Sequence, residues 1–303
     1  MTVHPARLLL LSGFAAFLAA CSPKGLVISM TADALSSSGE SFAREDDPDL
    51  VRGAAPFPLK AMESLLAEQP ENRDLLTALA RGFTQYSVAF VRQDAEEEAD
   101  PTLRRAGMER ASRLLLRAKG YGVRGLSVGR PGFPALLGSD PGAAASQAGE
   151  VDVPLLFWTA ASWSLAIAST PDDPALLADL PRCETLMRRA LLLNERFDGG
   201  AIHEYFIAFE GGRSEAMGGS AERARRHFER AMEINGGKKV SPLVTYAETV
   251  SVRAQNRREF LDFLDRALAF DARGTAPEYR LANLVAQRRA RWLKGRADDL
   301  FVE

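Results

Sequence analysis

The sequence predicts an all-α fold in which helical hairpins of degenerate tetratricopeptide-like repeats form a compact α-solenoid. Composition is the first reason: the 303 residues are 46% hydrophobic and 26% charged, strong helix formers dominate, and β-branched residues are sparse. The second reason is that apolar residues recur at helical spacing, and the third is that small and bulky residues alternate as in paired repeat helices. No segment alternates with period two, so no strands are expected.

The first twenty residues predict a bacterial lipoprotein signal peptide that is not part of the fold. His4 and Arg7 give a weakly positive start, Leu8–Leu18 are nearly all apolar, and small residues precede Cys21. The apolar run is too short for a comfortable membrane span. We expect the Cys21 thiol to receive diacylglycerol, and Ser22 after it favours the outer membrane. An ordinary signal peptide with a chance cysteine is the alternative.

The mature chain is predicted to consist of a tether and one domain. Residues 21–47, rich in Ser, Gly and charge, predict a flexible tether, and residues 48–303 a single helical-repeat domain. The formal net charge of −2 argues against a dedicated nucleic-acid binder. Once Cys21 carries lipid, Cys183 has no cysteine partner for an intramolecular disulfide, and its apolar helical neighbours indicate a buried side chain.

The helices of the domain justify the repeat prediction. One helix begins near Pro58 and ends before Pro70, and the next, over residues 71–93, places its apolar residues on one face. The second helix of a repeat is expected to carry small, bulky and small residues at i, i+4 and i+7. Strict or looser forms of this pattern occur at Ala111, Leu115, Ala118; Cys183, Met187, Ala190; Ala224, Phe228, Ala231; and Phe260, Leu264, Ala267. Matching first-helix patterns begin at Leu76, Trp158 and Leu243, and residues 129–150 form the longest segment without a helical pattern.

A glycine motif is the first candidate site. Gly120, Gly122 and Gly125 match G-x-G-x-x-G, the spacing of a loop that binds a dinucleotide pyrophosphate. That site needs a strand before the glycines and a helix after them, whereas here a helical pattern precedes them. We therefore expect no cofactor. Gly120 and Gly122 are instead expected to let the chain leave the helix just past Ala118, or to let a neighbouring helix pack closely.

Two further segments match known sites only in part. His203 and Glu204 begin an H-E-x-x-H pattern that lacks its second histidine, so no metal site is expected, and a hydrolase that uses this pair is a lesser alternative. Lys238 and Lys239 follow a predicted helix and complement its terminal carbonyl groups. The same two lysines are candidates to face an acidic partner.

Aromatic residues on predicted helices are the remaining candidates. Core packing is the default for all of them, but ligand pockets are mostly apolar and aromatic, so some are candidates to line a cavity. These residues are Tyr86, Phe90, Trp158, Trp163, Tyr205 and Phe206.

A series of landmarks in the mature chain is similar to a known family. The landmarks include "YSVAFVRQDAEEEAD", "RASRLLLRAKGYGVRGL", "DVPLLFWTAASW", "GGAIHEYFIAFE" and "RARRHFERAMEINGGKKVSPLVTYAETVSV". Together they resemble the T component of tripartite ATP-independent periplasmic (TRAP) transporters, from about Asp46 to the end of the chain. Phe157 stands where the family tends to have Tyr, and Gly125 where it usually has another residue.

The resemblance implies an all-helical periplasmic lipoprotein with cryptic tetratricopeptide-like units. It also implies partnership with a TRAP-type solute-binding protein, a homotrimer, and a cavity or channel for an apolar ligand, and it brings no catalytic residues. We therefore expect a non-enzymatic scaffold, anchored to the membrane through Cys21, that docks this partner and relays or binds an apolar ligand. A general outer-membrane assembly lipoprotein is the alternative. The candidate ligand- or partner-binding residues are Tyr86, Phe90, Tyr121, Arg124, Trp158, Trp163, His203, Tyr205, Lys238 and Lys239.

Overall fold

The computed structural model describes residues 39–302, and within this range every regular element is a helix. The expected signal peptide and Cys21 lie outside the described residues. The elements are α3 (Gly39–Ala43), α4 (Pro48–Ala54), α5 (Pro56–Glu68), α6 (Arg73–Tyr86), the π-helix η1 (Ser87–Arg92), α7 (Gln93–Glu97), α8 (Pro101–Ser127), α9 (Phe133–Ser139), α10 (Pro141–Ser146), the 3-10 turn η2 (Glu150–Asp152), α11 (Val153–Ser169), α12 (Pro174–Leu177), α13 (Leu180–Leu193), α14 (Phe197–Gly211), η3 (Glu215–Met217), α15 (Ala221–Asn235), α16 (Ser241–Tyr246), the π-helix η4 (Ala247–Ser251), α17 (Arg257–Ala269), η5 (Pro277–Tyr279), α18 (Arg280–Gly295) and α19 (Ala297–Leu300).

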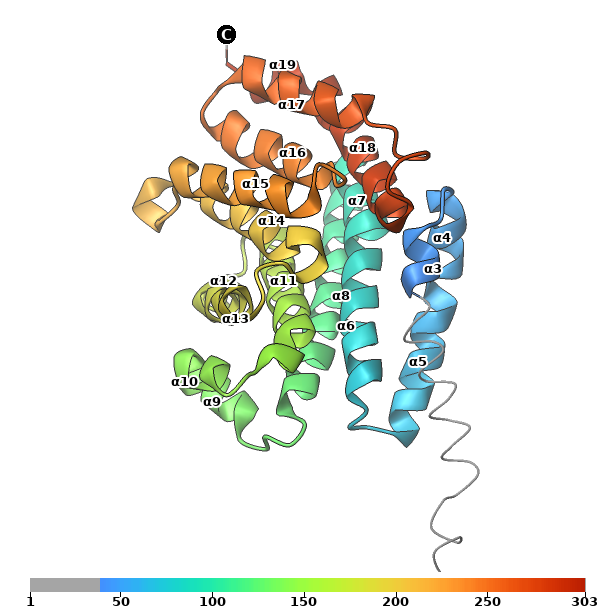
Figure 1. The fold of residues 1–303 in the computed structure, drawn as a ribbon, viewed down its shortest axis with the longest axis vertical. Coiled ribbons are helices and arrows are strands. Elements are labelled where there is room, and N and C mark those ends of the chain that lie inside the picture. The colour runs from blue at the N-terminus through green and yellow to red at the C-terminus, as the bar shows by residue number, and fades with distance from the viewer. Residues whose placement is uncertain (1–38, 303) are drawn as a thin grey trace, which may run out of the picture.

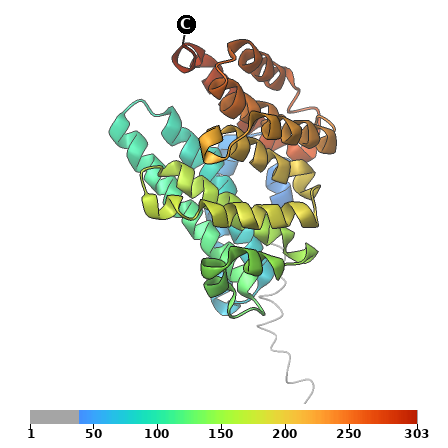
Figure 2. The same cartoon turned by 90° about the vertical axis from the view of Figure 1, so that its left-hand side faces the viewer.

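The helices form two groups that cross one another. Helices α6, α8 and α11 pack side by side as the upright layer of Figure 1, and α3–α5 run along one flank of it. Helices α14–α17 are stacked across the upper end of that layer, and α18 returns from them to contact α3 and α4. Figure 2, turned by 90°, shows the same crossing from the side. Because α18 contacts α3 and α4, the two ends of the described chain meet.

Side-chain caps fix where several helices begin. The Asn72 carboxamide accepts a hydrogen bond from Leu75 N at 3.0 Å and starts α6, and Asp100 caps α8 through Thr102 N at 2.7 Å. Pro101 follows directly at the first helical position, where its missing N–H costs nothing. Such signals are local, so they are readable from the sequence.

Three segments differ from their sequence-based expectation. Helix α8 continues through Gly120, Gly122 and Gly125 to Ser127, so these glycines do not end it. The segment 129–150, expected to be non-helical, contains α9 and α10. Helix α3 lies in the segment expected to be tether, and Arg280 of α18 donates to the carbonyl oxygen of Arg44 at 2.9 Å. Contacts with distant helices, which a local pattern does not encode, explain the first and third differences.

The interior is divided into three hydrophobic clusters. One is centred on α11 and α13, one on α15–α18, and one on α5, α6 and the middle of α8. All twelve residues of the small-bulky-small patterns are buried, including Cys183. Members of all three clusters, among them Leu59, Trp158 and Val244, line the cavity that is described below.

Helix α11 is apolar around most of its circumference because it lies inside the molecule. Among residues 39–302, Glu150–Ser169 is the one segment long and apolar enough to cross a membrane. In its most apolar stretch, however, 72% of the residues are buried in the fold. Its apolar composition is therefore accounted for by packing against α6, α8 and α13.

Candidate functional site

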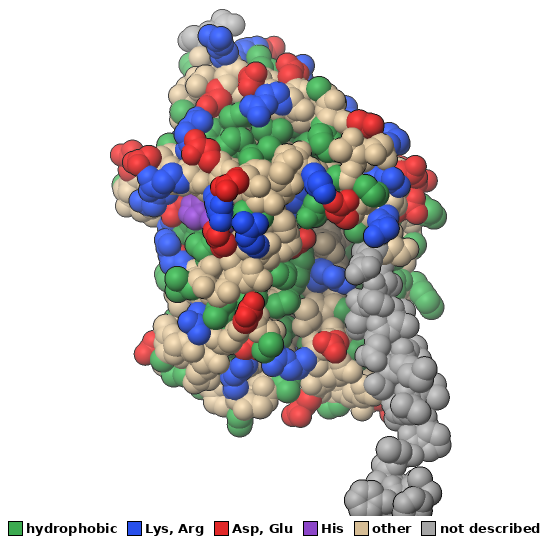
Figure 3. Space-filling model, viewed as in Figure 1, with side chains coloured by type: hydrophobic (Ala, Val, Ile, Leu, Met, Phe, Trp, Pro, Cys, Tyr) green, Lys and Arg blue, Asp and Glu red, His purple; other side chains and the backbone are tan. Residues whose placement is uncertain are grey.

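A cavity of about 860 Å³ lies between the upright layer, the flanking helices and the stacked C-terminal helices. Its wall is formed by α5, α6, η1, α11, α14, α16, η4 and α18, and Phe42 and Ala43 of α3 border it as well. Most lining side chains are apolar. Figure 3 shows hydrophobic side chains in the recess near the middle of this face, with charged side chains around it. The volume falls within the range of pockets that bind small molecules.

Aromatic side chains form much of the cavity wall. Tyr86 and Phe90 lie with ring centroids 5.8 Å apart, and Phe157 and Trp158 make an edge contact at 4.8 Å. On α14, Tyr205 lies in the wall, and its hydroxyl is 2.8 Å from Ser164 Oγ. Burial raises the pKa of Tyr205, so the phenol stays neutral. The wall thus offers rigid apolar faces.

Both π-helices of the described chain border the cavity. Val88 and Phe90 of η1 line it from the N-terminal side, and Glu248 and Thr249 of η4 line it from the C-terminal side. A π-helical turn widens a helix locally and leaves its backbone less regularly bonded, and such turns occur often at functional sites. Two of them at one cavity mark it as the candidate site.

An ionic cluster closes one part of the cavity wall. The Arg289 guanidinium lies 2.5 Å from Glu96 and also pairs with Glu248, while Arg92 lies 2.9 Å from Glu96. All four residues line the cavity. Burial disfavours the charged form of Arg289, but the carboxylates of Glu248 and Glu96 outweigh burial and raise its pKa. The cluster connects α18 to α7 and η4.

Lys239 and Glu204 form a second polar group in the wall. The Lys239 side chain is 8% exposed, and its Nζ donates to the carbonyl oxygen of Asp198 at 3.1 Å. Glu204 Oε2 is 3.9 Å from the same Nζ and accepts a hydrogen bond from Ser241 Oγ at 2.9 Å. A buried ammonium group therefore lies in the cavity wall, apart from the ionic cluster around Arg289.

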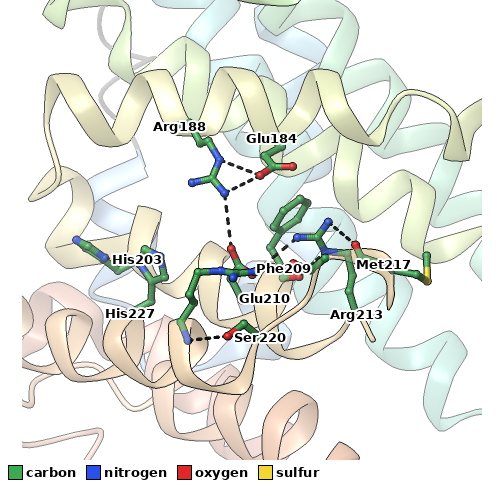
Figure 4. A network of polar contacts seen from close by, with 11 residues as sticks. Glu184, Arg188, His203, Phe209, Glu210, Arg213, Met217, Ser220 and His227 are labelled. Carbon is green, nitrogen blue, oxygen red and sulfur yellow. Dashed lines mark hydrogen bonds and ion pairs between the residues drawn. The ribbon is translucent and has the colours of Figure 1, made fainter. Parts of the chain in front are cut away.

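A buried carboxylate next to the cavity holds α13, α14 and α15 together. Glu210, 1% exposed, is 2.7 Å from Arg223 and 3.7 Å from Arg188. Arg213, which lines the cavity, is 3.9 Å from the same carboxylate and stacks over the Phe209 ring at 3.7 Å. Figure 4 shows these side chains converging from three helices. The network fixes the helices that carry the aromatic wall.

The two histidines of the described chain contact each other outside the cavity wall. His203 Nδ1 is 2.8 Å from His227 Nδ1, and Figure 4 shows the two side chains next to each other. His203 Nε2 is 3.2 Å from Glu195 Oε2. Burial lowers the pKa of both rings, that of His227 to about 4. Glu204 points instead to Ser241 and Thr245, so the structure separates the His203–Glu204 pair considered for a hydrolase. Within residues 39–302 no group of three His, Cys, Asp or Glu side chains is arranged to hold a metal ion.

Half of the sequence-predicted site residues meet at the cavity and half do not. The residues that line it are Tyr86, Phe90, Trp158, Tyr205 and Lys239. The residues outside it are Tyr121, Arg124, Trp163, His203 and Lys238.

The residues outside the cavity make contacts within the chain. Tyr121 stacks on Phe83 and donates its hydroxyl to Glu63, and Arg124 donates to the Pro70 carbonyl at 3.1 Å beside a shallow surface pocket. Trp163 is buried beneath Lys119, whose Nζ lies 3.8 Å from its ring. Lys238 pairs with Glu278 at 3.2 Å. Each of these side chains therefore has a partner within the protein, and no bound ligand is needed to explain its position.

Sequence reasoning did not single out Phe157, Arg213 or Arg289 for the cavity. Phe157 adjoins Trp158, which would have been a usable signal. Arg289 lies in a basic amphipathic segment that is typical of a solvated helix face, yet its side chain is only 16% exposed. Nothing in the sequence indicates that this arginine faces a cavity, because its partners Glu96 and Glu248 are far away along the chain.

A family model for the TRAP transporter T-component matches residues 44–301 of the chain. The chain belongs to the TRAP transporter T-component family. It is also 31% identical over 268 residues to an uncharacterised protein of Treponema pallidum (strain Nichols), covering 86% of this chain and 83% of that protein. The resemblance of the landmark segments is thereby confirmed. As a T component, the protein has a role in TRAP transport and a membrane-associated or periplasmic location.

Proposed function

We propose that this T component is a periplasmic, lipid-anchored scaffold that docks a TRAP-type solute-binding protein and binds an apolar ligand in its cavity. The observation that carries the proposal is the cavity of about 860 Å³ with its aromatic wall. An apolar molecule in this cavity would gain dispersion contacts with the aromatic wall and would remove apolar surface from water. The role of the family in transport is consistent with a ligand-binding cavity.

We propose further that the helices are degenerate tetratricopeptide-like repeats of a single domain. The burial of all twelve small-bulky-small residues supports this proposal, since that pattern packs the second helix of each repeat. The tether in this proposal runs from Cys21 to about residue 38, because α3 already contacts α18. Lipid on Cys21 would hold the domain at a membrane, with Ser22 favouring the outer one.

Self-association into a homotrimer and docking of the solute-binding protein belong to the same proposal. Large apolar side chains are exposed on the surface, among them Phe57 at 78% and Leu103 at 59%. Phe57 is aromatic, and aromatic side chains are enriched at protein interfaces. Arg124 is exposed beside the shallow surface pocket, so we choose it as a candidate for partner contact.

The cavity is tested with a filling substitution and a neutral fluorescent probe. Ala89 of η1 lines the cavity and is partly exposed into it, so Ala89→Trp fills the space without replacing a core residue. We expect N-phenyl-1-naphthylamine to bind the delipidated wild type and to lose at least tenfold in affinity with Ala89→Trp. The control is Ala175→Trp, on exposed α12 away from the cavity. Equal binding by both variants would place the probe elsewhere and remove the support for the cavity.

Docking is tested by pull-down of the delipidated protein with the solute-binding protein encoded nearby, over a range of salt concentrations. We expect association, weakened by Arg124→Glu and unchanged by Arg226→Glu on the exposed face of α15. Absence of association at every salt concentration would reject the docking part of the proposal. Light scattering of the same preparation measures the expected trimer.

A further inference from the structure

Lys239 is a buried charge with incomplete compensation. Other buried charged groups of the fold are tightly paired: Asp152 is 2.7 Å from Arg130, and Glu210 is 2.7 Å from Arg223. The Lys239 ammonium donates to a carbonyl oxygen at 3.1 Å, and its ion-pair partner, the Glu204 carboxylate, lies at 3.9 Å. A buried ammonium has three donors and is costly unless it is paired and hydrogen-bonded.

The groups around the Lys239 ammonium also line the cavity. Glu204 Oε2 accepts a hydrogen bond from Ser241 Oγ at 2.9 Å, and Thr245 Oγ1 lies 3.5 Å from Glu204 Oε1. The carbonyl that accepts from Lys239 belongs to Asp198, which adopts a left-handed conformation with φ 45°. Lys239, Glu204 and Ser241 all line the cavity, and Tyr279 covers the ammonium at 5.4 Å. The polar site is thus built into the wall.

We propose that Lys239 binds the anionic head group of an amphiphilic ligand, namely a long-chain carboxylate whose hydrocarbon chain lies against the aromatic wall. This inference rests on the proposed function and gives its apolar ligand a chemical class. A carboxylate supplies the short, charge-assisted hydrogen bonds that Lys239 lacks. The apolar and aromatic side chains of the cavity wall suit the hydrocarbon chain, because burial of each methylene is favourable.

Glu204 provides a second, independent test of the inference. Its carboxylate lies near the proposed head-group position and repels a second carboxylate there. Replacing it by glutamine keeps the shape and the hydrogen bond to Ser241 but removes the negative charge. The inference therefore predicts opposite effects for Lys239 and Glu204, which a purely structural role for the pair does not predict.

The test compares two probes of equal chain length, hexadecanoate and hexadecan-1-ol, by displacement of N-phenyl-1-naphthylamine at pH 8. We expect the wild type to prefer hexadecanoate by at least tenfold. Lys239→Met abolishes the preference and keeps the affinity for the alcohol, Lys239→Arg retains most of the preference, and Glu204→Gln increases it. Lys238→Met is the matched control, since Lys238 is adjacent in sequence but outside the cavity and paired with Glu278.

The outcomes separate this inference from the proposed function. Equal binding of acid and alcohol, or a preference that survives in Lys239→Met, overturns the inference while the cavity remains a binding site. Failure of both probes and of N-phenyl-1-naphthylamine to bind overturns the proposed function as well. Far-UV circular dichroism checks each variant, and if Lys239→Met does not fold, an unchanged preference in Glu204→Gln decides against the inference.

Discussion

Gly122 of α8 lies directly against Thr159 of α11. A Cβ atom at Gly122 would be 2.1 Å from Thr159 Oγ1 and 3.2 Å from its Cα, so part of the obstruction is backbone. Gly125, one turn further along, faces Leu155, where the close atoms all belong to the leucine side chain. The glycines that suggested a cofactor loop thus let the two central helices of the upright layer approach closely, and the aromatic residues of α11 are positioned by that approach.

Gly122→Ala is expected to lower the free energy of unfolding by about 1–3 kcal/mol, because the new methyl group overpacks the contact of α8 with α11. Gly120→Ala is the matched control: nothing lies within 4 Å of its added Cβ, and alanine favours the helix by about 0.5–1 kcal/mol. Urea unfolding of both variants measures the difference. Equal effects of the two substitutions would show that the close approach is not needed.

Arg289→Met is expected to destabilise the fold by about 2 kcal/mol, because it leaves Glu248 and Glu96 in the cavity wall without this partner. This destabilisation is smaller than that expected for a fully buried ion pair, because Glu248 is 34% exposed and Glu96 still pairs with Arg92. Arg226→Met is the control, since its pair with Glu222 is exposed and contributes about 0.5 kcal/mol or less. Thermal unfolding that does not distinguish the two would contradict a structural role for the ionic cluster.

The histidine pair predicts acid sensitivity. Burial first, and then His203, lowers the pKa of His227 from 6.5 to about 4, so the unfolded chain binds protons before the folded one does. Stability is therefore full above about pH 6.5 and is lost as the pH falls toward 4, by about 2 kcal/mol in all. We expect the melting temperature of the wild type to fall across this window and that of His227→Gln to fall less.

The other charged groups around the histidine pair keep their charge over most of this pH window. Arg230 lowers the pKa of Glu195 to about 2, so the contribution of Glu195 to the free energy of unfolding is lost only as the pH falls below about 4.5. The arginines that face the pair, Arg188, Arg226 and Arg230, stay charged throughout. An identical pH slope for wild type and His227→Gln would assign the acid sensitivity to another group.

Cys21→Ser is expected to move the protein from the membrane fraction to the soluble periplasmic fraction, because the lipid-accepting thiol is lost. Cys183→Ser is the control: Cys183 is buried, and burial raises the pKa of its thiol to about 12, which keeps it unreactive. Fractionation and metabolic labelling with radioactive palmitate measure both. Retention of label and membrane association in Cys21→Ser would reject the lipid anchor.

Features carried by neighbouring residues were predictable from the sequence. The spacing of apolar residues predicted the all-helical class, and the small-bulky-small triads named residues that are buried, such as Ala224 and Leu264. Tyr86, Phe90 and Trp158 were chosen as aromatic residues of predicted helices, and they do line the cavity. Trp163 and Phe206 satisfied the same criterion, yet they are buried outside the cavity wall, because the sequence does not state which face of a helix meets which neighbour.

The sequence by itself determined the all-helical class and the family, since helical periodicity and a series of ordered landmarks are properties of short stretches. Only the tertiary structure decided that α8 continues through three glycines, that Lys239 turns inward while Lys238 faces outward, and that Arg289 meets Glu96 and Glu248. The physical reason is that each of these depends on the packing of helices far apart in the chain. A cavity is the space such packing leaves open, so no local pattern encodes it.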